Sequence, residues 1–253
     1  QRGSINTTYS VTTAATMYAF RCLMRADIPS NSGCLVPIRT IIPQGTVVNS
    51  MHPAAVSAGN VETSQRITDV LLGALSQVCP ERVPAASQGT MNNLTIGGID
   101  PRKCPPRPFT YYETIAGGMG ARPSKDGADA IHTHMTNTRI TDPEILERRY
   151  PVMLREFSIR KDSGGSGKFK GGNGLIREVE FLEPLNTAIL SERRVHQPYG
   201  LNGGGPGKSG LNLFIRKDGS KLHLGGKNEI FAEAGDGIRI ETPGGGGYGK
   251  VGT

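Results

Sequence analysis

The sequence lacks several features that would place the protein in a specialised class. It has no tryptophan, aromatic residues make up only 6% of the chain, and no apolar run approaches the ~18 residues that cross a membrane. Its glycines follow no three-residue period, which excludes collagen. Hydrophobic residues make up 36% and charged residues 20% of the 253 residues, unlike a disordered chain. We therefore expect a soluble globular protein with no membrane partner.

The four cysteines lack the spacing of a zinc knuckle. Cys22, Cys34, Cys79 and Cys104 lie at least 12 positions apart, whereas a knuckle places two cysteines within a few residues of each other. A chain of this size needs no disulfides to stabilise its core. We expect buried free thiols.

The chain also lacks a basic stripe, although 29 Lys and Arg face 22 Asp and Glu and the formal net charge is +7. The basic residues are scattered, and the longest clusters are pairs such as Arg148-Arg149. Without aromatic residues interleaved among basic ones, we expect no nucleic-acid partner. A preference for small anionic substrates fits the charge as well.

Glycine, in contrast, is abundant and concentrated toward the C-terminus, where residues 163–253 hold 23 of the 35 glycines. Strand-like runs in this region are bounded by Gly or Asp-Gly, and Asp218-Gly219 is a hairpin signal. The runs are residues 175–181, 188–190, 211–216, 221–224 and 237–242. We expect mostly antiparallel β-structure with Gly-rich turns.

The first 162 residues favour helices and short strands. Residues 11–25 are apolar on nearly every face and predict a buried helix. Asn60 is a candidate cap for a second helix, and residues 35–38 and 40–42 are candidate short strands. The apolar face expected for the second helix consists of Ile67, Val70, Leu71, Ala74, Leu75 and Val78.

Prolines interrupt residues 79–108, where we expect loops. Thr141 and Glu144 form a capping box for a third helix that ends at Pro151. The predicted fold class is α+β. We expect residues 1–162 to be a mixed α/β part that carries the site, and residues 163–253 to be a β-rich part of the same domain.

A dense group of polar residues lies in residues 112–147. His132 and His134 would point the same way from an extended segment, as a metal pair or as an acid/base and its neighbour. The alternative is that one histidine bonds a backbone carbonyl and the other is exposed. Arg194 could contact an anion or form a structural ion pair.

Nine short motifs occur together along the chain. They are residues 87–93 (SQGTMNN), 111–118 (YYETIAGG), 132–139 (HTHMTNTR), 141–147 (TDPEILE), 164–167 (GGSG), 169–174 (FKGGNG), 192–194 (ERR), 198–200 (PYG) and 242–249 (TPGGGGYG). With these motifs the chain resembles the hydantoinase B / 5-oxoprolinase family from about Thr12 onward. Residues 136–144 look closer to 5-oxoprolinases than to N-methylhydantoinases or ketone carboxylases.

The resemblance implies ATP-dependent hydrolysis of a cyclic amide, as in the conversion of 5-oxoproline to glutamate in glutathione metabolism. A hydantoinase A-like domain or subunit would use ATP and Mg²⁺ to phosphorylate the amide oxygen, and the B-type part would assist attack of water. The family's B part is roughly twice this length. We therefore expect the chain to be its C-terminal half, inactive alone, with any divalent-metal ligands in the missing N-terminal half.

Carried over residue by residue, the resemblance places the site around a defined set of side chains. Glu113, His132 and His134 are the expected catalytic residues, with Glu113 or His132 as the base. The expected substrate-binding residues are Asn92, Asn93, Gly117, Gly118, Asn137, Arg139 and Arg194. The two glycines would offer backbone amides to a developing oxyanion.

Two other hypotheses stay open. The chain could belong to an N-methylhydantoinase or a ketone carboxylase component, or be a non-catalytic β-rich assembly module. In each case we expect a cytoplasmic protein that forms a homo-oligomer.

Overall fold

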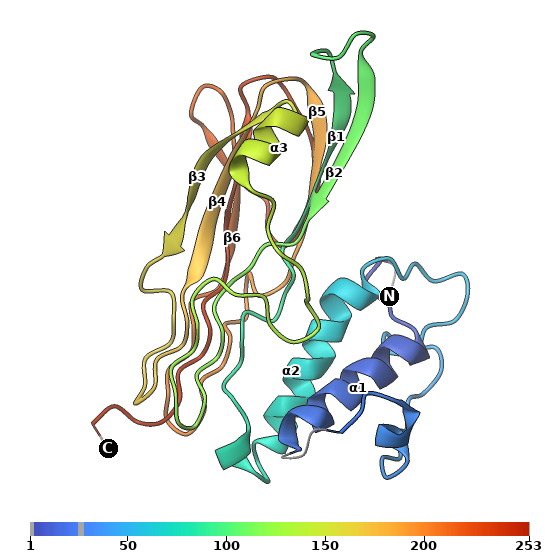
Figure 1. The fold of residues 1–253 in the computed structure, drawn as a ribbon, viewed down its shortest axis with the longest axis vertical. Coiled ribbons are helices and arrows are strands. Elements are labelled where there is room, and N and C mark those ends of the chain that lie inside the picture. The colour runs from blue at the N-terminus through green and yellow to red at the C-terminus, as the bar shows by residue number, and fades with distance from the viewer. Residues whose placement is uncertain (1–2, 25–27, 253) are drawn as a thin grey trace.

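The computed structural model describes residues 3–24 and 28–252, and the nine strands of this part of the chain form two antiparallel sheets (Figure 1). The first sheet has the order β2-β1-β5-β8 and the second the order β3-β4-β9-β6-β7. The strands are β1 (Asn93–Asp100), β2 (Arg107–Glu113), β3 (Val152–Arg160), β4 (Gly174–Phe181), β5 (Leu185–Leu190), β6 (Leu211–Ile215), β7 (Lys221–His223), β8 (Lys227–Ala232) and β9 (Gly237–Glu241).

The two sheets share one hydrophobic core. Along β4, buried residues alternate with partly exposed ones, as expected for a strand with one face on a core. Leu94 and Ile189 from the first sheet pack in the same cluster as Phe214 and Ile240 from the second. The sheets therefore form a sandwich to which both halves of the sequence contribute strands.

A helical layer lies beside this sandwich, at the lower right of Figure 1. It contains α1 (Tyr9–Leu23) and α2 (Ser64–Leu75), which pack against each other. Short helical turns, Ser32–Leu35, Gly59–Thr63 and Pro80–Arg82, accompany them. The cluster of fully buried apolar residues here is small, with Ala19, Leu72 and Val83. The third helix, α3 (Pro143–Arg149), packs on β3.

Extended glycine-rich segments run side by side below the sheets, at the lower left of Figure 1. Gly118 N donates to Pro243 O at 2.9 Å, and Gly165 N donates to Gly245 O at 2.8 Å. A Cβ atom on Gly118 would lie 2.0 Å from Gly172 O, and one on Gly245 would lie 2.1 Å from Met119 O. The backbones therefore touch directly, in the way that glycine allows at the crowded axis of collagen.

This packing predicts a large difference between two alanine substitutions. We expect Gly245→Ala to destabilise the protein by about 1–3 kcal/mol or more, because the new methyl group must displace backbone atoms. Gly3→Ala is the matched control, since nothing lies within 4 Å of its Cβ position. Urea unfolding of both variants is the measurement, and equal free energies of unfolding would rule out the packing role.

The α+β class is confirmed, and so are the five predicted strands beyond residue 163 and the Asp218-Gly219 hairpin between β6 and β7. Glycine does more than turn the chain, however. Gly219 and Gly225 adopt positive φ angles, whereas Gly118 and Gly245 serve the backbone packing. The division of the domain at residue 162 stays a prediction.

Several local expectations were wrong. Residues 35–38 and 40–42 form no strand, and β1 lies within the stretch expected to be loops. The cap of α3 is Asp142, whose carboxylate accepts from the amides of Glu144 and Ile145, rather than Thr141. The expected first helix matches α1, except that Arg25 lies outside the described residues. All four cysteines are free, but only Cys34 is buried, and Cys22 and Cys104 are exposed.

Candidate functional site

Three of the expected site residues line one cavity of about 510 Å³. His132, Asn137 and Arg139 stand on the irregular segment between β2 and α3. Ile140 and Phe157 contribute apolar surface to the same cavity. This combination of apolar surface and a few convergent polar groups is typical of a small-molecule site.

His132 is the imidazole that lines this cavity. Burial lowers the pKa of its imidazole, so the ring is neutral at pH 7. Its Nε2 lies 3.5 Å from Thr138 Oγ1, while its buried Nδ1 has no hydrogen-bond partner among the described residues. A neutral imidazole with an uncommitted nitrogen can act as a general base.

Arg139 supplies an uncommitted positive charge at the same cavity. It is exposed, and within residues 3–24 and 28–252 it forms no ion pair or hydrogen bond. Guanidinium groups bind carboxylate and phosphoryl oxygens in a bidentate manner. The cavity can therefore hold a ligand whose anionic group meets Arg139 and whose apolar ring meets Ile140 and Phe157.

Glu113 lies behind this cavity rather than in it. It is 5% exposed, its two carboxylate oxygens accept from Arg177 Nε and Nη2 at 2.7 and 3.0 Å, and Tyr111 donates to Oε2 at 2.6 Å. The Arg177 guanidinium in turn stacks 5.1 Å over the ring of Phe157. This geometry favours a supporting role for Glu113, and its role as a base stays a prediction.

His134 does not join His132. It has a positive φ of 58°, its Nδ1 lies 3.2 Å from the hydroxyl of Tyr18 in α1, and burial lowers its pKa. The two histidines therefore meet different partners and do not form a pair. In the part of the chain that the structure describes, no group of three or more His, Cys, Asp or Glu could hold a metal ion.

Gly117 and Gly118 are committed to packing. Gly117 forms an isolated bridge with Ile131, and its Cβ position would lie 2.1 Å from Gln88 Oε1. The amide of Gly118 already donates to Pro243 O. This amide is consequently not available to an oxyanion in the present geometry.

Asn92, Asn93 and Arg194 lie together in a second place, around a residue that the sequence analysis did not single out. Arg194 Nη1 donates to Asn92 Oδ1 at 2.7 Å, and Asn93 Nδ2 donates to Glu62 Oε1 at 2.7 Å. Glu62 Oε1 also accepts from Thr90 Oγ1 and from the amide of Met91, both at 3.1 Å. Glu62 is thus the centre of a buried polar network.

The Glu62 carboxyl is 1% exposed, and its Oε2 has no partner among the described residues. Burial raises the pKa of Glu62 to about 7, although the hydrogen bonds from Thr90 and Met91 and the charge of Arg194 oppose the shift. Burial likewise lowers the pKa of Arg194 to about 9. The carboxyl therefore titrates near neutral pH beside a cation that stays charged there.

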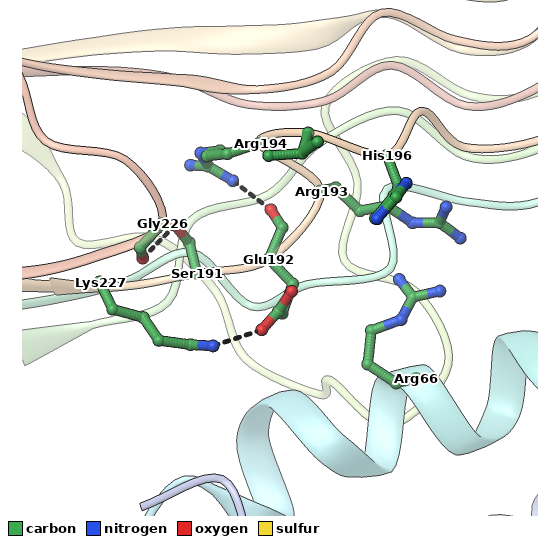
Figure 2. Close-up of a pocket in the computed structure, with 9 residues that line it drawn as sticks. Arg66, Ser191, Glu192, Arg193, Arg194, His196, Gly226 and Lys227 are labelled. Carbon is green, nitrogen blue, oxygen red and sulfur yellow. Dashed lines mark hydrogen bonds and ion pairs between the residues drawn. The ribbon is translucent and has the colours of Figure 1, made fainter. Parts of the chain in front are cut away.

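A cavity of about 530 Å³ lies next to this network and is lined by cations (Figure 2). Arg66 reaches it from α2, and Arg193 and Arg194 reach it from the segment after β5. Arg66 and Arg193 share the buried Asp69 at 2.8 Å each, and Lys227 pairs with Glu192 at 2.6 Å. Most of these cations are already paired, in contrast to Arg139.

The raised pKa of Glu62 predicts how stability depends on pH. Above about pH 4.5 the unfolded state releases the proton of Glu62, whereas the folded state keeps it up to about pH 7. The free energy of unfolding should therefore fall by roughly 1–3 kcal/mol over this range. We expect Glu62→Gln to lack this fall, and the exposed Glu81→Gln to retain it. Urea unfolding from pH 4.5 to 8 is the measurement, and curves of the same shape for all three proteins would contradict the assignment.

None of the helices in residues 3–24 and 28–252 has the length and apolar character of a membrane span.

A family model described as hydantoinase B/oxoprolinase matches residues 1–251. Among curated proteins, the chain is 52% identical over 248 residues to 5-oxoprolinase 1 of Arabidopsis thaliana. That alignment covers 98% of this chain but only 18% of the relative, so the chain spans less than a fifth of the relative's length.

Two solved structures share the fold. The ATP-dependent caprolactamase of Pseudomonas jessenii superposes with a TM-score of 0.84 at 27% identity, over 98% of this chain and 44% of that chain. A nucleotide-free acetone carboxylase superposes with a TM-score of 0.80 at 19% identity, over 97% of this chain and 38% of that chain. At this lower identity the second likeness shows the fold alone.

Proposed function

The chain belongs to the hydantoinase B/oxoprolinase family, and from this we propose that it is part of an ATP-dependent hydrolase of cyclic amides. The overall reaction would convert 5-oxoproline, ATP and water to glutamate, ADP and phosphate. The observation that carries the proposal is the 52% identity to a 5-oxoprolinase over 98% of this chain. The similarity to an ATP-dependent caprolactamase supports the same class of reaction.

A hydantoinase A-like domain or subunit would bind ATP and Mg²⁺ and supply the phosphoryl group that activates the ring amide. A lactam carbonyl is a poor electrophile, and a phosphorylated oxygen becomes a good leaving group. This chain would then hold the activated ring and direct water at its carbon. Any divalent metal would be held outside this chain, because its described residues offer no group of three or more His, Cys, Asp or Glu for one.

The cavity lined by His132, Asn137 and Arg139 is the place we propose for this step. The neutral His132 would take the proton from the attacking water, and the resulting imidazolium would return it to the ring nitrogen as the C–N bond breaks. A second water would then hydrolyse the acyl phosphate that remains to glutamate and phosphate. Arg139 and Asn137 would donate to the ring carboxylate or to phosphoryl oxygens. Ile140 and Phe157 would contact the apolar part of the ring.

Asn92, Asn93 and Arg194 would act from the neighbouring network rather than from this cavity. Through Asn92, Arg194 reaches Gln88 and the carbonyl of Ile115, and Ala116 lines the His132 cavity. The oxyanion role expected for Gly117 and Gly118 stays a prediction, and so does the catalytic role of Glu113 and His134. We propose further that the complete enzyme is a cytoplasmic homo-oligomer that includes the N-terminal half of the B part.

Substrate comparison tests the proposal. The complete protein that contains this chain, with its A-type partner, is incubated with ATP and 5-oxoproline, caprolactam, an N-methylhydantoin, or a ketone with bicarbonate. We expect ADP and glutamate in equal amounts with 5-oxoproline and at least 10-fold slower turnover of the others. Bicarbonate-dependent consumption of a ketone would replace the proposal with a carboxylase. If none of the compounds is consumed, with or without ATP, the proposal is wrong and the assembly-module hypothesis replaces it.

A further inference from the structure

Helix α2 leaves part of its apolar face exposed. The residues that it buries are mostly polar, and they are Ser64, Gln65, Thr68, Asp69 and Leu72. Gln65 is held by Thr133 O and Thr136 Oγ1, and Asp69 is held by Arg66 and Arg193. Of the predicted apolar face, Leu71 and Leu75 are partly buried against the small cluster that contains Leu72, whereas Val70 is 66% exposed.

The exposed part of this face is one wall of an apolar groove of about 560 Å³. Helix α1 contributes Phe20, and residues 38–48 form the opposite wall, where Ile41 is 80% exposed. The apolar residues of the groove include Phe20, Ile38, Ile41, Ile67, Val70 and Leu71. Apolar side chains that converge on one hollow mark a surface that another element covers, unlike single exposed residues such as Ile99.

The helical layer has too few buried apolar residues to stand alone. Its fully buried cluster is limited to Ala19, Leu72 and Val83, with partly buried neighbours that include Leu71. An amphipathic helix in a globular protein normally packs its apolar face on a core. Here part of that face, including Val70, is uncovered, so its burial by a partner would extend this small core.

We propose that the groove between α1, α2 and residues 38–48 is the docking surface for the portion of the B-type component that lies outside the matched region. The extent of that portion is given by the relatives. The matched region is 44% of the caprolactamase chain, so 56% of that chain lies outside the part that shares this fold. The proposal rests on the family membership and on the larger enzyme proposed above.

Apolar segments with a complementary acidic group would fit this surface. Arg39 and Arg66 lie in its lining, and no aspartate or glutamate does. A second copy of the same surface would bring these arginines together, which opposes self-association through this face. We therefore assign the groove to a different part of the same component and not to a symmetric dimer.

Thiol labelling in the complete protein tests this assignment. Val70→Cys is compared with Ile99→Cys, which is 60% exposed on β1, in a background where the exposed Cys22 and Cys104 are serine. We expect a maleimide to label position 70 at least 10-fold more slowly than position 99 in the assembled protein, and at an equal rate after denaturation. Equal rates in the assembled protein would overturn the proposal.

A photo-crosslinking amino acid at position 70 identifies the occupant. Adducts to residues of the B-type component outside the matched region support the proposal. Adducts to a second copy of residues 1–253 or to the A-type partner overturn it. Turnover of 5-oxoproline by the wild-type protein is measured separately. Absence of turnover contradicts the proposed function, whereas the labelling and crosslinking of position 70 test the docking surface.

Discussion

Arg177→Ala should destabilise the protein by about 3–5 kcal/mol, because it leaves the carboxylate of Glu113 buried without its counter-charge. The guanidinium of Arg177 is fully buried in the strand β4 and holds both oxygens of Glu113. It also stacks over Phe157, which lines the His132 cavity. The free energy of unfolding in urea measures the effect.

A matched control separates the buried pair from ion pairs in general. Arg155 pairs with Glu180 at 2.6 Å between the neighbouring strands β3 and β4, but this pair is largely exposed. We expect Arg155→Ala to cost far less than Arg177→Ala, because solvent screens an exposed ion pair. The double variant Arg177→Met, Glu113→Leu should recover much of the lost stability, since no buried charge remains. If Arg177→Ala and Arg155→Ala lower the free energy of unfolding equally, burial does not increase the contribution of the Arg177–Glu113 pair.

His132→Ala should reduce kcat of the complete enzyme by about 10²–10⁴-fold at pH 7, the range associated with loss of a general base. The neutral imidazole in the cavity would no longer accept the proton of water. Steady-state production of glutamate is the measurement. His223→Ala, on the exposed strand β7, is the control and should change kcat less than 2-fold.

His134→Ala distinguishes His134 from His132, the other histidine of the 132–139 motif. His134 contacts Tyr18 and lies away from the cavity, so we expect lower stability with kcat retained. If His134→Ala lowers kcat by about 10²-fold or more while His132→Ala leaves it unchanged, the base is misassigned.

Local patterns of sequence predicted the elements whose signals are local. The Asp218-Gly219 turn and the alternating residues of β4 need no distant partner to be recognised. β1 was missed because the prolines on both sides of it suggested loops, although pairing with β2 and β5 supplies its hydrogen bonds. Tertiary pairing outweighed the local signal there.

The contacts of the site were not predictable because they join residues far apart in the sequence. Glu62 meets Asn93, 31 positions away, and Glu113 meets Arg177, 64 positions away. The periodicity of α2 marked its apolar face correctly, but nothing in the period says which face turns inward. The polar side was buried because Gln65 and Asp69 find hydrogen-bond partners there.

The backbone packing of the glycines was also beyond a reading of the sequence alone. High glycine content near the C-terminus is equally consistent with turns, and some of these glycines do form turns. The close approach of Gly118, Gly172 and Gly245 depends on the three-dimensional arrangement of three separate segments.

The central claim is that this chain acts on a ring already activated by ATP, and a single-turnover experiment tests it most directly. The complete enzyme carrying His132→Ala is mixed with ATP and 5-oxoproline, and ADP and glutamate are followed from the first turnover. We predict a burst of about one ADP per active site that requires 5-oxoproline, with little or no glutamate. Glutamate formed at the wild-type rate, or loss of the ADP burst together with glutamate, would contradict the claim.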